Sequence, residues 1–215
     1  RDHSRGRSMS EFERIAVIGA GVMGAGIAAQ VANAGKRVVL LDIVPKGAAN
    51  RNVIAEEAIA KMQKANPAPL MHRRNAKRIT PGNIEDDLGL LAECDWIIEA
   101  VIEKPEIKQS LYRKIEAVRK HGSIVSSNTS TLPIAVLTKD MPDRFVQDFL
   151  IAHFFNPPRY MRLLEIVAGE RTRCEAVDRV REFADVVLGK SVVDCKDRPG
   201  FIANRIGTFW LQCSV

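Results

Sequence analysis

The sequence has no apolar run near the 18 residues that a membrane-spanning helix needs, and no apolar core typical of a secretory signal. Its four cysteines are scattered, without a Cys-x-x-Cys pair, which is typical of reduced cysteines in a cytoplasmic protein. No histidine, cysteine and carboxylate residues cluster at metal-ligand spacing. We therefore expect a cytoplasmic protein with no membrane span, no disulfide framework and no metal site.

The sequence also has little excess charge. The net charge is +6, part of which comes from residues 1–10, R-D-H-S-R-G-R-S-M-S. We interpret residues 1–10 as a disordered leader or tag scar, with Met9 near its end as the native start. The remaining charge is too small to indicate a nucleic-acid partner, although it suits an anionic ligand. The hydrophobic content of 46% and charged content of 27% are those of an ordinary globular protein.

A glycine motif is the most informative feature of the sequence. The β-branched run 15–18 predicts a buried strand, and it leads through G-A-G-V-M-G into an alanine-rich helix. In such a turn the first glycine permits tight geometry, the second lets the backbone approach a pyrophosphate, and the third lets helix and strand pack closely. The helix N-terminus then receives the phosphates. We assign this turn to a dinucleotide site, with Gly19, Gly21, Val22, Met23 and Gly24 as its cofactor-binding residues.

An acidic residue follows at the expected place. The next strand, 37–42, ends in Asp42, close to the spacing of about 20 residues at which a carboxylate binds the adenosine ribose. This carboxylate favours NAD, because it would repel the 2′-phosphate of NADP. The alternative interpretation is a structural βαβ unit that binds no cofactor.

Beyond Asp42 the pattern alternates between helices and strands. We expect helices over 46–66, 105–120, 174–188 and 201–211, strands over 96–101, 123–126, 150–152, 163–167 and 191–195, and a turn at 80–83. This rhythm predicts an α/β fold with a Rossmann-type, doubly wound, mostly parallel sheet, in which ligands bind at the carboxyl ends of the strands. Ser130 and His153 are predicted to lie just after strand ends. The last helix is apolar on one face, so we infer the first helix of a truncated all-α domain.

Four further motifs occur in fixed order behind the glycine motif: S-N-T-S (127–130), H-F-F-N-P (153–157), L-L-E-I-V (163–167) and P-G-F-I-A-N-R (199–205). Taken alone, His153 is more typical of a structural core histidine than of a catalyst. With these motifs, the chain from about Arg14 onward resembles the L-3-hydroxyacyl-CoA dehydrogenase family. The resemblance implies an NAD-binding Rossmann domain over 11–197, followed over 198–215 by the start of a helical domain for dimerisation and substrate binding.

The resemblance also implies roles for individual residues. His153 would be the general base for the 3-hydroxyl proton, and Glu165 would orient its ring and stabilise the imidazolium. Ser130 and Asn204 would hydrogen-bond the substrate oxygens. The cofactor's ribose and nicotinamide end would be lined by Glu103, Lys108, Asn128 and Asn156. For Glu103 and Lys108 the alternative is a weak surface ion pair at a helix start.

The coenzyme A site is where the sequence departs from the family pattern. The resemblance places a serine and a lysine on the helix after the second strand, near where this chain has Ala58 and Ala65. We therefore expect coenzyme A phosphates to be bound by cations of the basic stretch, with Lys61, Lys64, Arg73 and Arg74 as candidates. The alternative is that these cations form a solvated helix face.

The predicted function is NAD-dependent oxidation of an L-3-hydroxyacyl-CoA to the 3-ketoacyl-CoA in fatty-acid β-oxidation. The wording of several segments, such as I-T-P-G-N-I-E-D-D, further resembles bacterial β-oxidation proteins in which an enoyl-CoA hydratase domain shares the chain. The full-length parent is expected to be a homodimer. Two alternatives stay open: a dehydrogenase of a small free hydroxy acid, and a dinucleotide-binding module with little activity alone.

Overall fold

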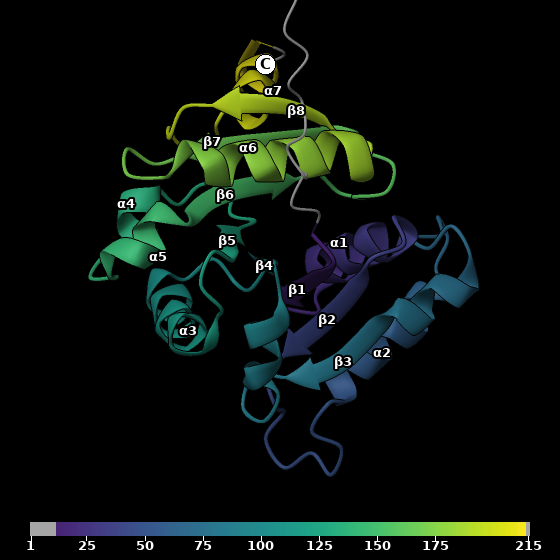
Figure 1. Ribbon diagram of the computed structural model, residues 1–215. Coiled ribbons are helices and arrows are strands. Elements are labelled where there is room, and N and C mark those ends of the chain that lie inside the picture. The colour runs from purple at the N-terminus through teal and green to yellow at the C-terminus, as the bar shows by residue number, and fades with distance from the viewer. Residues whose placement is uncertain (1–11, 214–215) are drawn as a thin grey trace, which may run out of the picture.

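A computed structural model describes residues 12–213, so the expected leader lies outside the described residues. Eight strands form one sheet in the order β3-β2-β1-β4-β5-β6-β7-β8 (Figure 1). The strands are β1 (Arg14–Ile18), β2 (Arg37–Asp42), β3 (Ile79–Asn83), β4 (Trp96–Glu99), β5 (Ile124–Ser127), β6 (Phe149–Phe154), β7 (Leu163–Ala168) and β8 (Ser191–Cys195). Every neighbouring pair is parallel except β6 and β7, which are antiparallel. The predicted doubly wound, mostly parallel sheet is confirmed.

Helices cover both faces of this sheet. The α-helices are α1 (Val22–Asn33), α2 (Val53–Met62), α3 (Pro105–Val118), α4 (Ile134–Leu137), α5 (Asp143–Gln147), α6 (Cys174–Glu182) and α7 (Ala203–Cys213). Shorter elements are the 3-10 helices η1 (Arg73–Arg78) and η2 (Leu88–Glu93) and the π-helix η3 (Phe183–Val187). Helices α1, α2 and α6 contribute to the core on one face, and α3, α4 and α5 to the core on the other.

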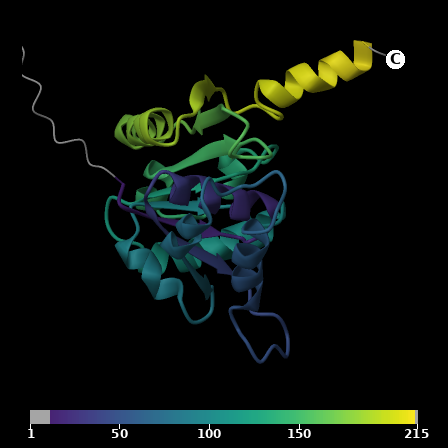
Figure 2. The same ribbon diagram turned by 90° about the vertical axis from the view of Figure 1, so that its right-hand side faces the viewer.

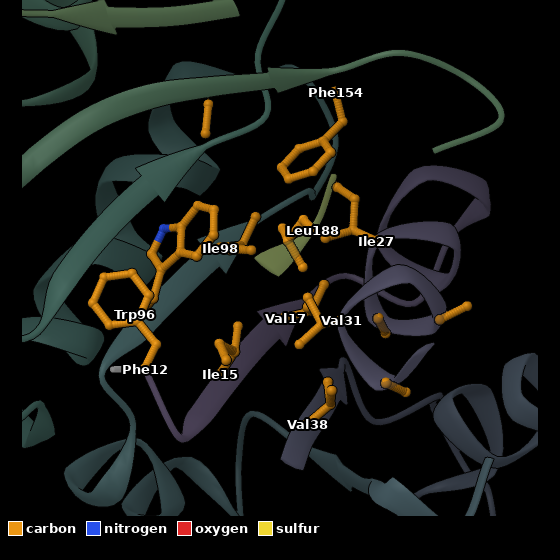
Figure 3. Packing of buried hydrophobic residues seen from close by; sticks show 14 of the residues in the cluster. Phe12, Ile15, Val17, Ile27, Val31, Val38, Trp96, Ile98, Phe154 and Leu188 are labelled. Atoms are coloured by element: carbon orange, nitrogen blue, oxygen red, sulfur yellow. The ribbon is translucent and has the colours of Figure 1, made fainter. Parts of the chain in front are cut away.

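The alternation of side chains along β1 explains both cores. Ile15 and Val17 belong to the first cluster, whereas Ala16 and Ile18 belong to the second. A strand buried on both faces therefore has a continuous apolar sequence, which is what a central parallel strand needs. In the first cluster, the Trp96 ring lies 5.9 Å from Phe12 and 6.4 Å from Phe154, centroid to centroid (Figure 3). Its indole N–H donates to Ser126 Oγ at 2.9 Å.

The segment 80–83, predicted as a turn, is a strand, so that prediction is wrong. It forms most of β3, the edge strand, and pairs in parallel with β2, with Pro81 opposite Leu40. An edge strand tolerates proline, because the missing N–H can face away from the sheet. The turn-forming residues Pro81, Gly82 and Asn83 are thus overridden by pairing with the buried β2.

Several predicted helix bounds are also wrong. The helix expected over 46–66 begins only at Val53, because the side-chain oxygen of Asn50 accepts from the Asn52 N–H and holds a turn before it. The helix expected over 174–188 changes to a π-helix at Phe183. His153 lies within β6 rather than just after it. The other predicted helices and strands differ from the observed bounds by only a few residues, whereas the short helices α4, α5, η1 and η2 were not predicted.

The last helix, α7, leaves the sheet and projects from the rest of the molecule (Figure 2). Ile206 is 63% exposed and Phe209 is 68% exposed, so the apolar face predicted for this helix contacts little of the described chain. No helix within residues 12–213 is long and apolar enough to cross a membrane.

Candidate active site

The glycine turn has the stereochemistry predicted for it. Gly19 has a φ of +103°, and its N–H donates to the Leu41 carbonyl at 2.8 Å. A Cβ at Gly19 would lie 2.6 Å from the Ala100 carbonyl oxygen, and a Cβ at Gly24 would lie 1.7 Å from the Gly19 carbonyl oxygen. A Cβ at Gly21 would meet no atom within 4 Å. Gly19 and Gly24 are therefore required by the fold, whereas Gly21 is not.

Helix α1 begins directly at this turn. Gly21 is the N-cap, no side chain caps the helix, and the first turn carries Val22, Met23 and Gly24. The first N–H groups of a helix have no partner within it and carry its positive dipole end. With Gly21 exposed beside them, these N–H groups fit a dinucleotide pyrophosphate.

A fourth glycine has a role that the motif did not reveal. A Cβ on Gly26 would lie 2.8 Å from Cδ of Pro158, in the loop between β6 and β7. Gly26 therefore lets this loop lie directly on α1. The same loop begins with Asn156, one of the predicted cofactor residues, which is exposed. The spacing of Gly26 two residues after Gly24 was the available signal.

Asp42 lies half-buried at the end of β2, beside the glycine turn. Its Oδ2 accepts from the Ala20 N–H and its Oδ1 from the Ile43 N–H at 2.7 Å. Each carboxylate oxygen retains capacity for a further donor, such as a ribose hydroxyl. Two apolar side chains at the same edge were not predicted: Ile43 after β2 is 58% exposed and Ile102 after β4 is 59% exposed.

A buried polar network lies behind the predicted nicotinamide end. Glu99, fully buried at the end of β4, accepts from Lys108 Nζ at 2.6 Å, Tyr112 OH at 2.6 Å and Ser127 Oγ at 2.8 Å. Burial, and then the Glu99 charge, raise the pKa of Tyr112 well above its ordinary value. Lys108 is only 1% exposed, so the surface-pair alternative is wrong for it. Sequence analysis missed Glu99, whose partners come from distant elements.

The network reaches the loop after β5 through Glu103. Lys108 Nζ lies 3.2 Å from Glu103 Oε2. The other oxygen, Glu103 Oε1, accepts from Thr129 Oγ1 at 2.7 Å and from the Ser130 N–H at 3.1 Å. The loops after β4 and β5 are therefore joined, and Ser130 is placed by its backbone while its hydroxyl stays available.

Asn128 is held on the adjacent strand end. Its side-chain oxygen accepts from the backbone N–H of Phe154 at 2.9 Å, and its backbone N–H donates to the Glu99 carbonyl at 2.7 Å. Because the amide oxygen is engaged, the group that Asn128 can offer a ligand is its amide N–H₂.

His153 and Glu165 form a close pair across the antiparallel strands. They are register partners on β6 and β7, and Nδ1 of His153 lies 2.8 Å from Oε2 of Glu165. Glu165 is 1% exposed and His153 is 7% exposed. The rings of Phe155 and Phe201 lie 4.5 Å and 5.7 Å from the imidazole, centroid to centroid. The neighbouring carboxylate assigns the hydrogen to Nδ1 and leaves Nε2 as the acceptor.

The second oxygen of Glu165 anchors the start of α7. Oε1 accepts from the N–H groups of Ile202 at 3.0 Å and Ala203 at 2.8 Å. Asn204 follows on the first turn of the helix and is exposed. It lines a hollow of about 670 Å³ together with Thr131, the neighbour of Ser130. The structure thus brings the segments of Ser130 and Asn204 to one hollow.

A second hollow, of about 540 Å³, lies beside the glycine turn. Its walls come from α1, α2 and the loop that starts at Asn156, and they include Ala58, Lys61 and Ala65. Lys61 also pairs with Glu57 at 3.4 Å on the exposed face of α2. The other three predicted cations, Lys64, Arg73 and Arg74, are exposed but do not line this hollow. Arg159, which does line it, was not predicted.

Comparison with known proteins shows to which family the chain belongs. A family model described as the NAD-binding domain of 3-hydroxyacyl-CoA dehydrogenase matches residues 14–198. The chain belongs to this family. The predicted family and NAD as its cofactor are thereby confirmed, whereas the dehydrogenase activity, the roles of individual site residues and the domain boundaries stay predictions.

Relatives are found among curated proteins and solved structures. The chain is 47% identical over 203 residues to a protein of Rickettsia felis named as a fatty acid oxidation complex trifunctional enzyme, covering 94% of this chain and 28% of that protein. It is 47% identical over 199 residues to a Deinococcus radiodurans protein named as a 3-hydroxyacyl-CoA dehydrogenase, covering 93% of this chain and 58% of that protein. The crystal structure of Escherichia coli 3-hydroxybutyryl-CoA dehydrogenase superposes with a TM-score of 0.79 at 30% identity, covering 95% of this chain and 43% of that one. The chain thus spans 28% to 58% of the length of these relatives.

Proposed function

We propose that this chain is the NAD-binding half of an enzyme that oxidises L-3-hydroxyacyl-CoA to 3-ketoacyl-CoA in cytoplasmic fatty-acid β-oxidation. The observation that carries the proposal is the buried His153–Glu165 pair, 2.8 Å apart and tied to the segment that begins α7. A dinucleotide-binding module without chemistry has no need of an imidazole oriented by a buried carboxylate.

Proton removal is the step that this pair would perform. With Nδ1–H donated to Glu165, Nε2 of His153 accepts the proton of the substrate 3-hydroxyl. The carboxylate stabilises the imidazolium that forms, and the two N–H groups on its other oxygen keep it from turning. Bound NAD supplies the hydride acceptor. Ser130 and Asn204 would hold the substrate oxygens, which fixes C3 in a reactive orientation.

NAD fits the residues at the carboxyl ends of the strands. The N–H groups at the start of α1 would bind the pyrophosphate, Asp42 the adenosine ribose, and Ile43 and Ile102 would contact the adenine. Glu103, Lys108, Asn128 and Asn156 would surround the nicotinamide end. The bonds from Glu103 to Thr129 Oγ1 and to the Ser130 N–H support this proposal, because they join a predicted cofactor residue to the segment of a predicted substrate residue.

The coenzyme A portion of the substrate would bind in the hollow between α1 and α2. Lys61 and Arg159 line it, together with Glu57, the partner of Lys61. The rest of its wall is mostly small or apolar, which suits a pantetheine chain, and a phosphate end would compete with Glu57 for Lys61. The exposed cations Lys64, Arg73 and Arg74 do not line this hollow, so we expect no direct contact between them and the coenzyme A phosphates.

One structural feature favours the module alternative for this chain taken alone. Helix α7 exposes Ile206 and Phe209, and Asn204 stands at the start of this same helix. We propose that in the parent protein residues 198–215 begin a helical domain that completes the substrate pocket and forms a homodimer. The trifunctional naming of relatives supports a parent that also carries an enoyl-CoA hydratase domain.

Calorimetric titration tests the proposal, first with NAD and then with acetoacetyl-CoA in the presence of NAD. Binding of both ligands supports a substrate surface within this chain. A Lys61→Met variant should then weaken acetoacetyl-CoA binding, whereas an exposed control, Lys64→Met, should not. Binding of NAD alone would favour the module alternative. Binding of free 3-hydroxybutyrate as tightly as the coenzyme A ester would favour the small hydroxy acid dehydrogenase.

A further inference from the structure

The loop between β6 and β7 is fastened at two places. On one side Arg159 Nη1 donates to the Ala68 carbonyl at 2.6 Å, and Tyr160 OH donates to the same carbonyl at 3.0 Å. On the other side a lysine just before β8, Lys190, donates through Nζ to the carbonyls of Pro158 and, at 2.9 Å, Met161. The loop is therefore held between the segment after α2 and the start of β8.

Lys190 is an unusual lysine. It is only 2% exposed, whereas lysines are rarely buried without a counter-ion. Among residues 12–213 no carboxylate pairs with it. Its ammonium instead faces two carbonyl oxygens and the ring of Phe154, whose centroid lies 5.6 Å from Nζ. The charge is thus stabilised almost wholly by the loop that it holds.

Burial lowers the pKa of Lys190 from 10.5 to about 8, with no charged neighbour contributing. The elements around it carry few titratable groups. On the loop these are Arg159, Tyr160 and Arg162, on η3 Asp185, on β8 Asp194 and Cys195, and on β6 His153, the residue before Phe154. On α1 the uncharged Gln30 donates through Nε2 to the Leu188 carbonyl at 2.8 Å. None of these groups forms an ion pair with Lys190 in the described chain.

The loop that Lys190 holds forms part of the candidate site. Asn156, Pro157, Pro158, Arg159 and Tyr160 all line the hollow beside the glycine turn. Pro158, whose carbonyl Lys190 binds, also packs on Gly26 of α1. Bonds from an ammonium are about twice as strong as those from a neutral amine, so loss of the proton loosens this wall.

We propose that Lys190 is a positioning residue whose ammonium fixes the loop 156–161 against α1 and so shapes the hollow in which the substrate binds. The identity of that substrate rests on the proposed function, but the fixing of the loop does not. The loosened state of the loop is one in which Lys190 stays buried but loses its carbonyl partners, so relative to that state the fixed loop favours the ammonium. By linkage, a ligand that needs the fixed loop then binds the protonated form more tightly.

Hydrogen exchange of the loop tests the proposal without any ligand. The Tyr160 and Met161 N–H groups both donate to the Pro157 carbonyl at 3.0 Å, so their protection reports the loop. After correction for intrinsic exchange, protection should fall several-fold from pH 7 to pH 9 in the wild type, while peptides of α3 change little. Lys190→Met should give low protection at both pH values, and the exposed control Lys196→Met should follow the wild type. Equal wild-type protection at both pH values, or wild-type behaviour of Lys190→Met, would overturn the proposal.

A charge-retaining variant and a ligand complete the test. Lys190→Arg, verified as folded by circular dichroism, should keep its protection at pH 9; if it does not fold, the wild type and Lys190→Met alone decide. Affinity for butanoyl-CoA in the presence of NAD should fall several-fold from pH 7 to pH 9 in the wild type only. Wild-type binding without this pH dependence would overturn the shaping of the hollow. Failure to bind butanoyl-CoA at either pH, with the exchange result intact, would refute the proposed substrate and leave the role of Lys190 standing.

Discussion

At the scale of single residues, substitutions at the glycines of the turn allow effects on NAD binding to be distinguished from effects on folding. A Cβ at Gly21 meets no atom of the protein, and the φ of −67° there suits any residue. Gly21→Ala should therefore keep the free energy of unfolding within about 1 kcal/mol of the wild type. It should nevertheless weaken NAD binding about tenfold or more, equivalent to 1.4 kcal/mol, because the methyl group obstructs the pyrophosphate. Calorimetry with NAD and urea unfolding measure the two effects.

Gly24→Ala is the matched control for this prediction. Its Cβ would lie 1.7 Å from the Gly19 carbonyl oxygen, so the helix must move away from the strand. We expect this variant to lose about 2 kcal/mol or more of unfolding free energy. If Gly21→Ala binds NAD as the wild type does, the pyrophosphate does not lie over this turn.

The predicted role of His153 as general base gives the second prediction at this scale. In a full-length parent, His153→Gln should lower the rate of the chemical step by about 10²–10⁴-fold, because the variant has no group to accept the hydroxyl proton. NAD affinity should stay unchanged, since the imidazole is held by Glu165 and not by the glycine turn. Single-turnover kinetics and NAD titration measure these quantities. A normal chemical rate would exclude His153 from the mechanism.

At the scale of elements, the turn that joins η3 to β8 carries a pH-dependent contribution to stability. The pKa of Lys190 is about 8 in the folded state and 10.5 ordinarily. Below pH 8 the amine is protonated in both states, and burial of its charge opposes folding in full. Between pH 8 and 10.5 the unfolded state binds more protons, so stability rises with pH.

The prediction that follows from this pKa compares the wild type with Lys190→Met. The unfolding free energy of the wild type minus that of Lys190→Met should increase by up to about 3 kcal/mol from pH 7.5 to pH 10. Urea unfolding at the two pH values measures this difference. Loop protection and global stability would then change in opposite directions with pH, and a difference independent of pH would contradict the lowered pKa.

Sequence predicted the elements best where local pattern and tertiary structure agree. The β1–α1–β2 unit could be read from apolar runs and glycines, because a strand buried on both faces and a tight turn each leave a local signature. Segment 80–83 could not, since its pairing with β2 overrides the turn preference of Pro81 and Gly82. The π-helix that follows α6 gave no local signal either.

The candidate site was predictable only in part, because some of its contacts leave no local signature in the sequence. His153 and Glu165 were found only through a resemblance carried by several motifs, because their contact depends on the antiparallel register of β6 and β7. Glu99 and Lys190 were missed, since a buried charge in a sequence looks like any exposed one. What identifies both is the set of distant partners that the fold brings to them.

At the scale of the whole molecule, α7 predicts a missing neighbour. Ile206 is 63% exposed, so Ile206→Lys in this chain should change the unfolding free energy by no more than about 0.5 kcal/mol. In a full-length parent, where a helical domain would cover this face, the same change should cost at least about 2 kcal/mol. Denaturant unfolding of both proteins measures the contrast, with the core variant Ile98→Ala destabilising both. Equal small effects would mean that the face stays exposed in the parent.

The carboxylate of Glu165 links the side chain of one residue, His153, to the position of a whole helix, α7. One oxygen holds the imidazole, and the other holds the two N–H groups at the point where the chain leaves the sheet for α7. A rotation of α7 about this point must either break those bonds or carry the carboxylate with it. Movement of α7 relative to the sheet is therefore transmitted to the imidazole of His153 through one carboxylate.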